Sequence, residues 1–168
     1  MIFLRKIKKG VTSLLKEWGK DDSYVKGEVF EDYVLKILFP KTKYFLLEKT
    51  HDSNVNEENF VKSSLKPDFK FKCKKTKKEF CIEAKFRSEL YKNKIVWATT
   101  QQLKRYKEEN KTAPVFICIG HGGSPSNPEN IFIFPVNKAK YTGLYKSFLE
   151  DFEVTGGKAV TPKKLWSM

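Results

Sequence analysis

The chain has 168 residues, of which 40% are hydrophobic and 14% aromatic, with 33 Lys and Arg against 20 Asp and Glu for a formal net charge of +13. This length suits a single domain, and the apolar content excludes a disordered chain, because such a sequence can offset the entropy cost of ordering. The positive charge favours a polyanionic partner, nucleic acid before an anionic membrane surface, and a lysine-rich surface kept for solubility is the alternative.

The cysteines and the apolar segments bear on the compartment. Cys73, Cys81 and Cys118 are scattered without CxxC spacing, so they predict neither a disulfide framework nor a zinc site. No apolar run approaches the length of a membrane span, and the basic N-terminal stretch lacks the continuous apolar region of a signal peptide. We therefore expect a cytoplasmic protein without a membrane partner.

Helical periodicity dominates the N-terminal part of the chain. Residues 3–18 predict an amphipathic helix, and residues 27–39 predict a second helix that ends at Pro40. In the second helix Glu31 lies at the border of the apolar stripe, where a carboxylate is costly unless something compensates its charge.

The rest of the chain alternates between strand and helix patterns. Residues 51–64 and 121–130 are polar and rich in turn-forming residues, which predicts loops, with His121 as a turn residue. Strands are expected at residues 43–50, 68–73, 79–86, 113–120 and 131–136, and helices at residues 94–109, 140–151 and 161–166.

This order predicts one α/β domain with helices packed on a central sheet. We expect residues 27–136 to form the core of the domain, with residues 1–26 as an N-terminal helical extension and residues 137–168 as a C-terminal helical tail. The tryptophans Trp18, Trp97 and Trp166 are expected in the core.

In the hairpin of residues 68–86, strand geometry decides which side chains share a face. Side chains alternate across a strand, so the apolar sets Phe69, Phe71, Cys73 and Phe80, Ile82, Ala84 must face the same core. The opposite face then holds Asp68 and Lys70 with Cys81, Glu83 and Lys85. A two-residue turn at residues 75–76 would place Asp68 directly opposite Glu83, and neighbouring odd registers also keep the two acids close.

Two carboxylates side by side repel, and a cation should lie between them. Lys85 is one candidate, and a divalent Mg²⁺ or Mn²⁺ ion, which prefers oxygen ligands, is the other. Such an ion activates water and stabilises charge on a phosphate. The alternative is a solvated strand face with mixed charges, which the hairpin alone does not exclude.

The Pro67-Asp68 pair followed by Glu83-Ala84-Lys85 resembles the PD-(D/E)xK nuclease superfamily, which has the restriction-endonuclease-like fold. Two further motifs support the resemblance. Gly27 precedes Glu31 by four residues, as in the first helix of the family, and Gln102 with Tyr106 resembles the QxxxY motif of its helicase-associated exonuclease and resolvase branch. The matched region covers residues 27–106.

The resemblance implies a central mixed sheet flanked by helices and an Mg²⁺-dependent deoxyribonuclease. It implies that Asp68 and Glu83 hold the metal, that the Ala84 carbonyl and Glu31 complete the site directly or through water, and that Lys85 positions the attacking water. It further implies that Gln102 and Tyr106 orient the site or contact the substrate strand.

Basic residues around this site are expected to bind the phosphate backbone of DNA: Lys70, Lys72, Arg87, Lys104 and Arg105. A solvated lysine face is the alternative for the lysines of the hairpin. The rival function is a catalytically inactive nucleic-acid-binding domain of the same fold, and a third is a domain whose basic face binds an acidic protein. A homodimer or a separate protein partner is compatible with the sequence.

Overall fold

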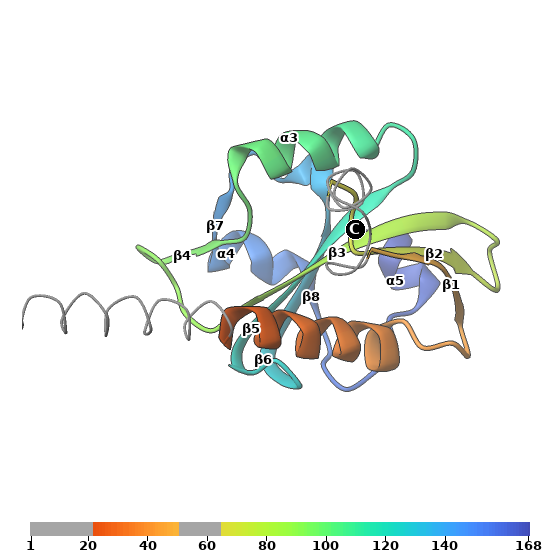
Figure 1. Ribbon diagram of the computed structural model, residues 1–168, viewed down its shortest axis with the longest axis horizontal. Helices are drawn as coiled ribbons and strands as arrows, with labels where there is room; N and C mark the ends of the chain where they lie inside the picture. The colour runs from red at the N-terminus through yellow and green to blue at the C-terminus, as the bar shows by residue number, and fades with distance from the viewer. Residues whose placement is uncertain (1–21, 51–64) are drawn as a thin grey trace, which may run out of the picture.

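The computed structural model describes residues 22–50 and 65–168. The helix predicted at residues 3–18, the loop predicted at residues 51–64 and the core position predicted for Trp18 lie outside these residues. Within them, a six-stranded sheet runs in the order β1-β2-β3-β5-β6-β8, with helices on both of its sides (Figure 1). The strands are β1 Tyr44–Lys49, β2 Phe69–Cys73, β3 Glu79–Arg87, β5 Val115–Ser124, β6 Asn127–Pro135 and β8 Glu153–Val154.

The sheet is mixed. Strands β3 and β5 are parallel, whereas the pairs β1–β2, β2–β3, β5–β6 and β6–β8 are antiparallel. A parallel pair needs a crossover connection, and here the crossover contains helix α3 (Thr100–Glu109). The predicted α/β class, with a central mixed sheet flanked by helices, is therefore confirmed.

The first described helix is longer than the sequence predicts. Residues 22–33 are α-helical, and the helix continues as the π-helix η1 (Val34–Leu38) before Pro40. The expected start at Gly27 is wrong. An ion pair of 2.7 Å between Asp22 and Lys26, one turn apart, supports the added turn.

The hairpin of β2 and β3 has the predicted faces and the predicted parity of register. Phe69 pairs with Ile82 and Lys72 with Glu79, and Asp68, directly before Phe69, accepts the N–H of Ala84 with its carboxylate. The predicted two-residue turn is wrong, because the last paired residues are Cys73 and Lys78, whose backbones bond at 2.9 Å. The longer turn closes with Lys77 at a positive φ of 60°.

The stretch predicted as one helix at residues 94–109 divides in two. Its first part is strand β4 (Lys94–Val96), which pairs with β7 (Gly143–Tyr145) in a separate two-stranded sheet. Helix α3 begins only after Thr99, whose side chain and that of Gln102 cap each other's backbone N–H groups. Such a reciprocal cap fixes a helix start, so the β-branched Ile95 and Val96 are free to pair in a strand.

Residues 121–130 form strand ends and a short turn, not the predicted loop. His121 lies in β5 and pairs with Asn130, so it is not a turn residue, and the hairpin turns only at Pro125 and Ser126. Gly122 and Gly123 both have positive φ, of 68° and 61°. This backbone conformation explains the glycines, which favoured a loop when the sequence was considered alone.

The last part of the chain is less helical than expected. It contains η2 (Val136–Lys138), α4 (Lys146–Leu149), η3 (Glu150–Phe152) and α5 (Pro162–Trp166), together with strands β7 and β8. Helix α5 starts with the predicted cap, since the side chain of Thr161 accepts a hydrogen bond from the backbone N–H of Lys164 at 3.2 Å. No helix in residues 22–50 and 65–168 is long and apolar enough to cross a membrane.

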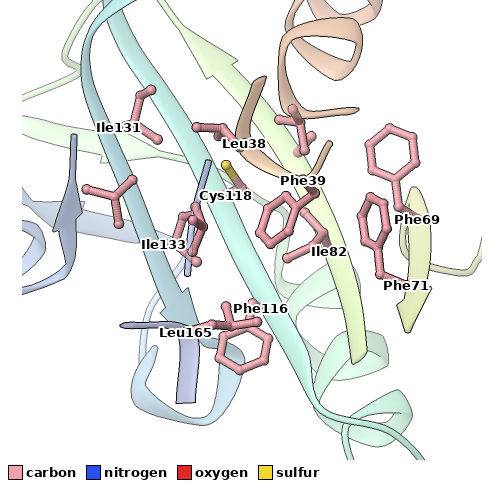
Figure 2. Packing of buried hydrophobic residues seen from close by; sticks show 14 of the residues in the cluster. Leu38, Phe39, Phe69, Phe71, Ile82, Phe116, Cys118, Ile131, Ile133 and Leu165 are labelled. Carbon is pink, nitrogen blue, oxygen red and sulfur yellow. The ribbon is translucent and has the colours of Figure 1, made fainter. Parts of the chain in front are cut away.

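The core has two parts, one on each side of the sheet. Alternate residues of β5 pack in the two parts: Phe116 and Cys118 lie in one, and Ile117 and Ile119 lie in the other. Figure 2 shows the first part, where Phe71 of the hairpin lies beside Phe39, and Leu165 of the C-terminal helix lies beside Phe116. Trp97 is fully buried in the second part, as expected, and Trp166 packs at the edge of the first. A strand covered on both faces gives the site a rigid base.

Candidate active site

Asp68 is held by backbone contacts on both sides. Its backbone carbonyl accepts a hydrogen bond from the N–H of Thr50 at 2.8 Å, and the carbonyl of Pro67 accepts one from the Thr50 hydroxyl at 2.9 Å. Its carboxylate accepts the N–H of Ala84 at 2.8 Å. The pairing of β2 with β3 ends at Phe69, so the carboxylate takes a β3 donor beyond the last pair.

Glu83 is the buried charged residue of the described chain, with 2% of its surface exposed. Its Oε1 forms an ion pair of 2.5 Å with the ammonium of Lys85. Its Oε2 is buried and has no hydrogen-bond partner among residues 22–50 and 65–168. A buried carboxylate oxygen without a donor is costly, so the position has a polar group that a further ligand can satisfy.

The negative charges of Asp68 and Glu83 repel each other. Burial raises the pKa of Asp68 well above its usual range, and the charge of Glu83 raises it further, while Lys85 and the N–H of Ala84 act in the opposite direction. Burial lowers the pKa of Lys85, but the charges of Glu83 and Asp68 outweigh it, so the pKa lies above the usual value. Lys85 is therefore a cation that balances only one of two acids.

Helix α3 brings the predicted Gln102 and Tyr106 to the same place. Tyr106 is 3% exposed, and its pKa is raised by burial and then by the charge of Glu83. It therefore stays protonated beside the acid. The side-chain oxygen of Gln102 accepts the backbone N–H of Thr99 at 2.9 Å, so this residue also serves as the cap of the helix.

Glu31 reaches the site from the first helix. Its carboxylate lies 3.6 Å from the ammonium of Lys49 on β1, which supplies the compensation that its position at the core border requires. Its charge also raises the pKa of Asp68, although less than burial and the charge of Glu83 do. The carboxylate is therefore within electrostatic reach of the acid pair.

All six residues predicted as catalytic, and Ala84, line one cavity of about 680 Å³. The cavity opens between the first helix, the hairpin and α3. Basic side chains share its wall with the acids: Lys26, Lys49, Lys66, Lys85 and Arg87. The geometry thus gathers residues that are up to 75 positions apart in the chain, between Glu31 and Tyr106.

The donors present fit a hard divalent cation. Asp68, directly before β2, and Glu83 on β3 supply two carboxylates, and Oε2 of Glu83 is buried without a hydrogen-bond partner among the described residues. Within residues 22–50 and 65–168, no three His, Cys, Asp or Glu side chains are grouped closely enough to hold a metal ion. A metal here would accordingly rest on two carboxylates and on carbonyl or water oxygens, with Glu31 acting at longer range.

The predicted DNA-binding residues do not form one group. Lys70 and Lys72 both lie beside Glu79, at 3.1 and 3.6 Å, near the hairpin tip. Arg87 lines the cavity, but its guanidinium donates to the backbone carbonyls of Val96, Phe86 and Trp97. The remaining two lie on α3, where Lys104 is exposed and Arg105 is half-buried. Their binding of DNA stays a prediction.

Sequence reasoning missed Lys49 and Thr50 as parts of the site. Lys49 compensates Glu31, and Thr50 fixes the backbone of Asp68. Both follow from the pairing of β1 beside β2, a contact between distant segments for which the sequence carries no local signal. Glu31 at the border of an apolar stripe was a signal that some cation had to lie close by.

No protein-family model matches the chain, and no curated protein matches it either. Among solved structures, the chain is similar to the 1.6 Å structure of Hjc, a Holliday junction resolvase from the archaeal hyperthermophile Archaeoglobus fulgidus. The two are 14% identical, with 66% of this chain and 81% of the resolvase covered and a TM-score of 0.45. A likeness of this extent leaves the function to be argued from the residues of this chain.

Proposed function

We propose that the protein is a Mg²⁺-dependent nuclease with a restriction-endonuclease-like core that hydrolyses phosphodiester bonds in DNA. One observation carries the proposal. Asp68, directly before β2, and Glu83 on β3 line a shared cavity, and Lys85, the residue after Ala84, holds one oxygen of Glu83. Such an arrangement costs stability in a binding module and is useful where charge must be controlled at a phosphate.

Lys85 is a cation held by the two acids. The charges of Glu83 and Asp68 keep its pKa above the usual value, and its ammonium is paired with Glu83. An ammonium has three N–H donors, and it can hold Glu83 while it orients the attacking water or donates to a phosphate oxygen. Lys85 therefore acts as a positioning and charge-stabilising group.

The two acids supply the metal ligands. Asp68 and Glu83 would hold Mg²⁺, with Mn²⁺ as the substitute, and the Ala84 carbonyl would complete the set with water. When bound, the ion lowers the pKa of the attacking water and neutralises charge on the phosphate. The backbone bonds at Pro67, Asp68 and Ala84 keep the first carboxylate in place before any ion arrives.

The outer residues of the cavity set its shape and field. Glu31, which pairs with Lys49, contributes to the raised pKa of Asp68 from the side of the first helix. The buried Tyr106 keeps its hydroxyl proton beside Glu83, which allows it to donate to an acid or to substrate. Gln102 caps α3 and so fixes the helix that carries Tyr106.

The overall charge is suited to a nucleic-acid substrate. A net charge of +13 attracts a polyanion, and the contacts with phosphates release counterions, so binding should weaken steeply with salt. The charge brings DNA to the protein without selecting a sequence or a structure.

A panel of DNA substrates tests the proposal. Supercoiled, linear, single-stranded and branched DNA are incubated with Mg²⁺ or with a chelator, and the products are separated on gels. We expect cleavage of at least one substrate with Mg²⁺ and none with the chelator. Binding without cleavage under Mg²⁺ and Mn²⁺ would overturn the proposal in favour of a catalytically inactive DNA-binding domain.

A further inference from the structure

The small sheet of β4 and β7 exposes an aromatic face beside the cavity. Ile95 and its partner Leu144 point into the core, and the alternate residues point outward. The outward side holds the pair Lys94 and Tyr145, and Tyr91 joins it through a bridge to Lys94. A strand pair this short presents one buried face and one face to the solvent.

Three tyrosines on this part of the surface are unusually exposed. Tyr91 is 64% exposed, Tyr141 71% and Tyr145 55%. Tyr141 lies just before β7, and its backbone carbonyl accepts the indole N–H of Trp97 at 3.2 Å, which anchors it next to the sheet. Large apolar rings this far in water contribute little to the fold, so folding does not account for three of them together.

Lysines accompany the rings. The Lys94 ammonium lies 4.7 Å from the ring centre of Tyr145, and the Lys92 ammonium lies 5.5 Å from that of Tyr91. Lys140 precedes Tyr141 and is exposed. The face therefore alternates flat aromatic surface with positive charge.

The face is fixed next to the proposed site. Strand β3, which carries Glu83 and Lys85, ends at Arg87, and the following Ser88 and Glu89 line the cavity. Tyr91 comes two residues later, before the turn into β4, and bridges to Lys94. Arg87 bonds to the carbonyls of Val96 and Trp97, so the end of β3 and the end of β4 are tied together.

We propose that this face, formed by Tyr91, Tyr141 and Tyr145 with Lys92, Lys94 and Lys140, binds single-stranded DNA that enters the cavity. Unpaired bases stack on aromatic rings, and ammonium groups balance the phosphates between them, whereas the bases of a duplex are already stacked on each other. The inference rests on the proposed nuclease, because it takes the bound strand to run from this face into the cavity. It implies that the substrate has an unpaired segment beside the scissile bond.

Binding measured without cleavage tests the face. The full chain, with chelator present, is titrated into labelled oligo-dT of about 20 nucleotides and into a duplex of the same length, and fluorescence anisotropy is recorded. The triple variant Tyr91→Ala, Tyr141→Ala, Tyr145→Ala should bind oligo-dT at least about tenfold more weakly, because each stacked base contributes several-fold to affinity. Its binding to the duplex should change by less than about twofold.

Two further variants control for fold and charge. The matching triple Tyr→Phe variant keeps the rings and should bind oligo-dT as the wild type does. Phe45→Ala removes a ring on β1 that is 49% exposed and also lies under a lysine, Lys74, at 4.6 Å. Since β1 is on the other side of the molecule from β4 and β7 (Figure 1), this variant should also bind normally.

The outcomes separate the two proposals. The proposed role of the face is overturned if the alanine variant binds oligo-dT like the wild type, or if it loses as much affinity for the duplex as for oligo-dT. It is also overturned if the phenylalanine variant fails to bind oligo-dT. If the wild type cuts no DNA while the alanine variant selectively loses oligo-dT binding, the nuclease is overturned and the face stands. If the wild type cuts DNA and the alanine variant binds normally, the reverse holds.

Discussion

The outward side of the β2–β3 hairpin carries two charge clusters that differ in their surroundings. Near the tip, Lys70 and Lys72 lie beside Glu79, and the glutamate side chain is 40% exposed. At the other end, Glu83 and Lys85 lie beside Asp68, and the glutamate side chain is only 2% exposed. Both clusters combine acids and lysines at alternate positions of the same strands.

The difference teaches that burial, rather than spacing, marks the site. Ion pairs in water contribute about 0–1 kcal/mol each, because solvent screens them. Removing one partner of a buried pair leaves a charge without compensation, which costs about 3–5 kcal/mol. Replacing the ion pairs of the tip cluster should therefore cost the fold little, whereas the inner cluster is costly to keep buried and calls for a functional explanation.

The largest expected effect is the loss of DNA cleavage when either of the two acids is replaced. Asp68→Asn and Glu83→Gln should each lower the cleavage rate by more than about 10³-fold, since each removes a proposed metal ligand and with it several kcal/mol of charge stabilisation in the transition state. Single-turnover rates with Mg²⁺ measure this. Glu79→Gln, the same change at the tip, should keep the wild-type rate, and equal losses in the two clusters would contradict the comparison.

Lys85→Ala should lower the cleavage rate by about 10²- to 10³-fold, because a charge-stabilising donor is lost. The rate at saturating DNA is the quantity to measure, since binding in the ground state should change little. The control is Lys36→Ala on the first helix, which removes an exposed lysine whose ion pair with Asp32 has a length of 2.7 Å. A Lys85→Ala variant with the activity of the control would remove this residue from the mechanism.

The same substitution tests stability. Lys85→Ala leaves Glu83 buried without its cation, and we expect the free energy of unfolding to fall by about 2 kcal/mol, less than for fully buried pairs because Lys85 is partly exposed. Urea unfolding in chelator measures the change. Glu79→Gln should alter the free energy of unfolding by less than about 0.5 kcal/mol, and similar changes at both positions would contradict the role given to burial.

Asp68 should make stability depend on pH in the absence of metal. Its folded pKa is raised by burial and by Glu83, so the folded state holds the proton more tightly than the unfolded state. The contribution is complete below the unfolded pKa of about 3.8–3.9 and is lost as pH rises through the raised folded value. In chelator, Asp68→Asn should therefore gain stability relative to the wild type as pH increases, and a constant difference would contradict the raised pKa.

Much of the inner cluster could be predicted because it follows from alternation. The phenylalanines of the hairpin require one face to be buried, and that places Asp68, Glu83 and Lys85 on the other. The parity of the register was predicted although the turn was not, because a longer turn with Lys77 at positive φ has the same parity as the two-residue turn.

The failures have a common physical cause. Residues 94–96 form a strand because they pair with residues 143–145, and no window of sequence contains both partners. Residues 121–130 extend a hairpin although glycines and prolines favour a loop, since the buried β5 and β6 continue their ladder through them. The cap of α3 was readable in advance, because Thr99 and Gln102 have the spacing of a capping box.

Metal binding at the inner cluster tests the central claim most directly. Mn²⁺ is titrated into the wild type, Asp68→Asn and Glu79→Gln, and the free ion is followed by its electron paramagnetic resonance signal. We predict that the wild type and Glu79→Gln bind Mn²⁺ with the same affinity and that Asp68→Asn loses at least about tenfold in affinity. Equal binding by all three proteins, or none by the wild type, would contradict a metal site on Asp68 and Glu83.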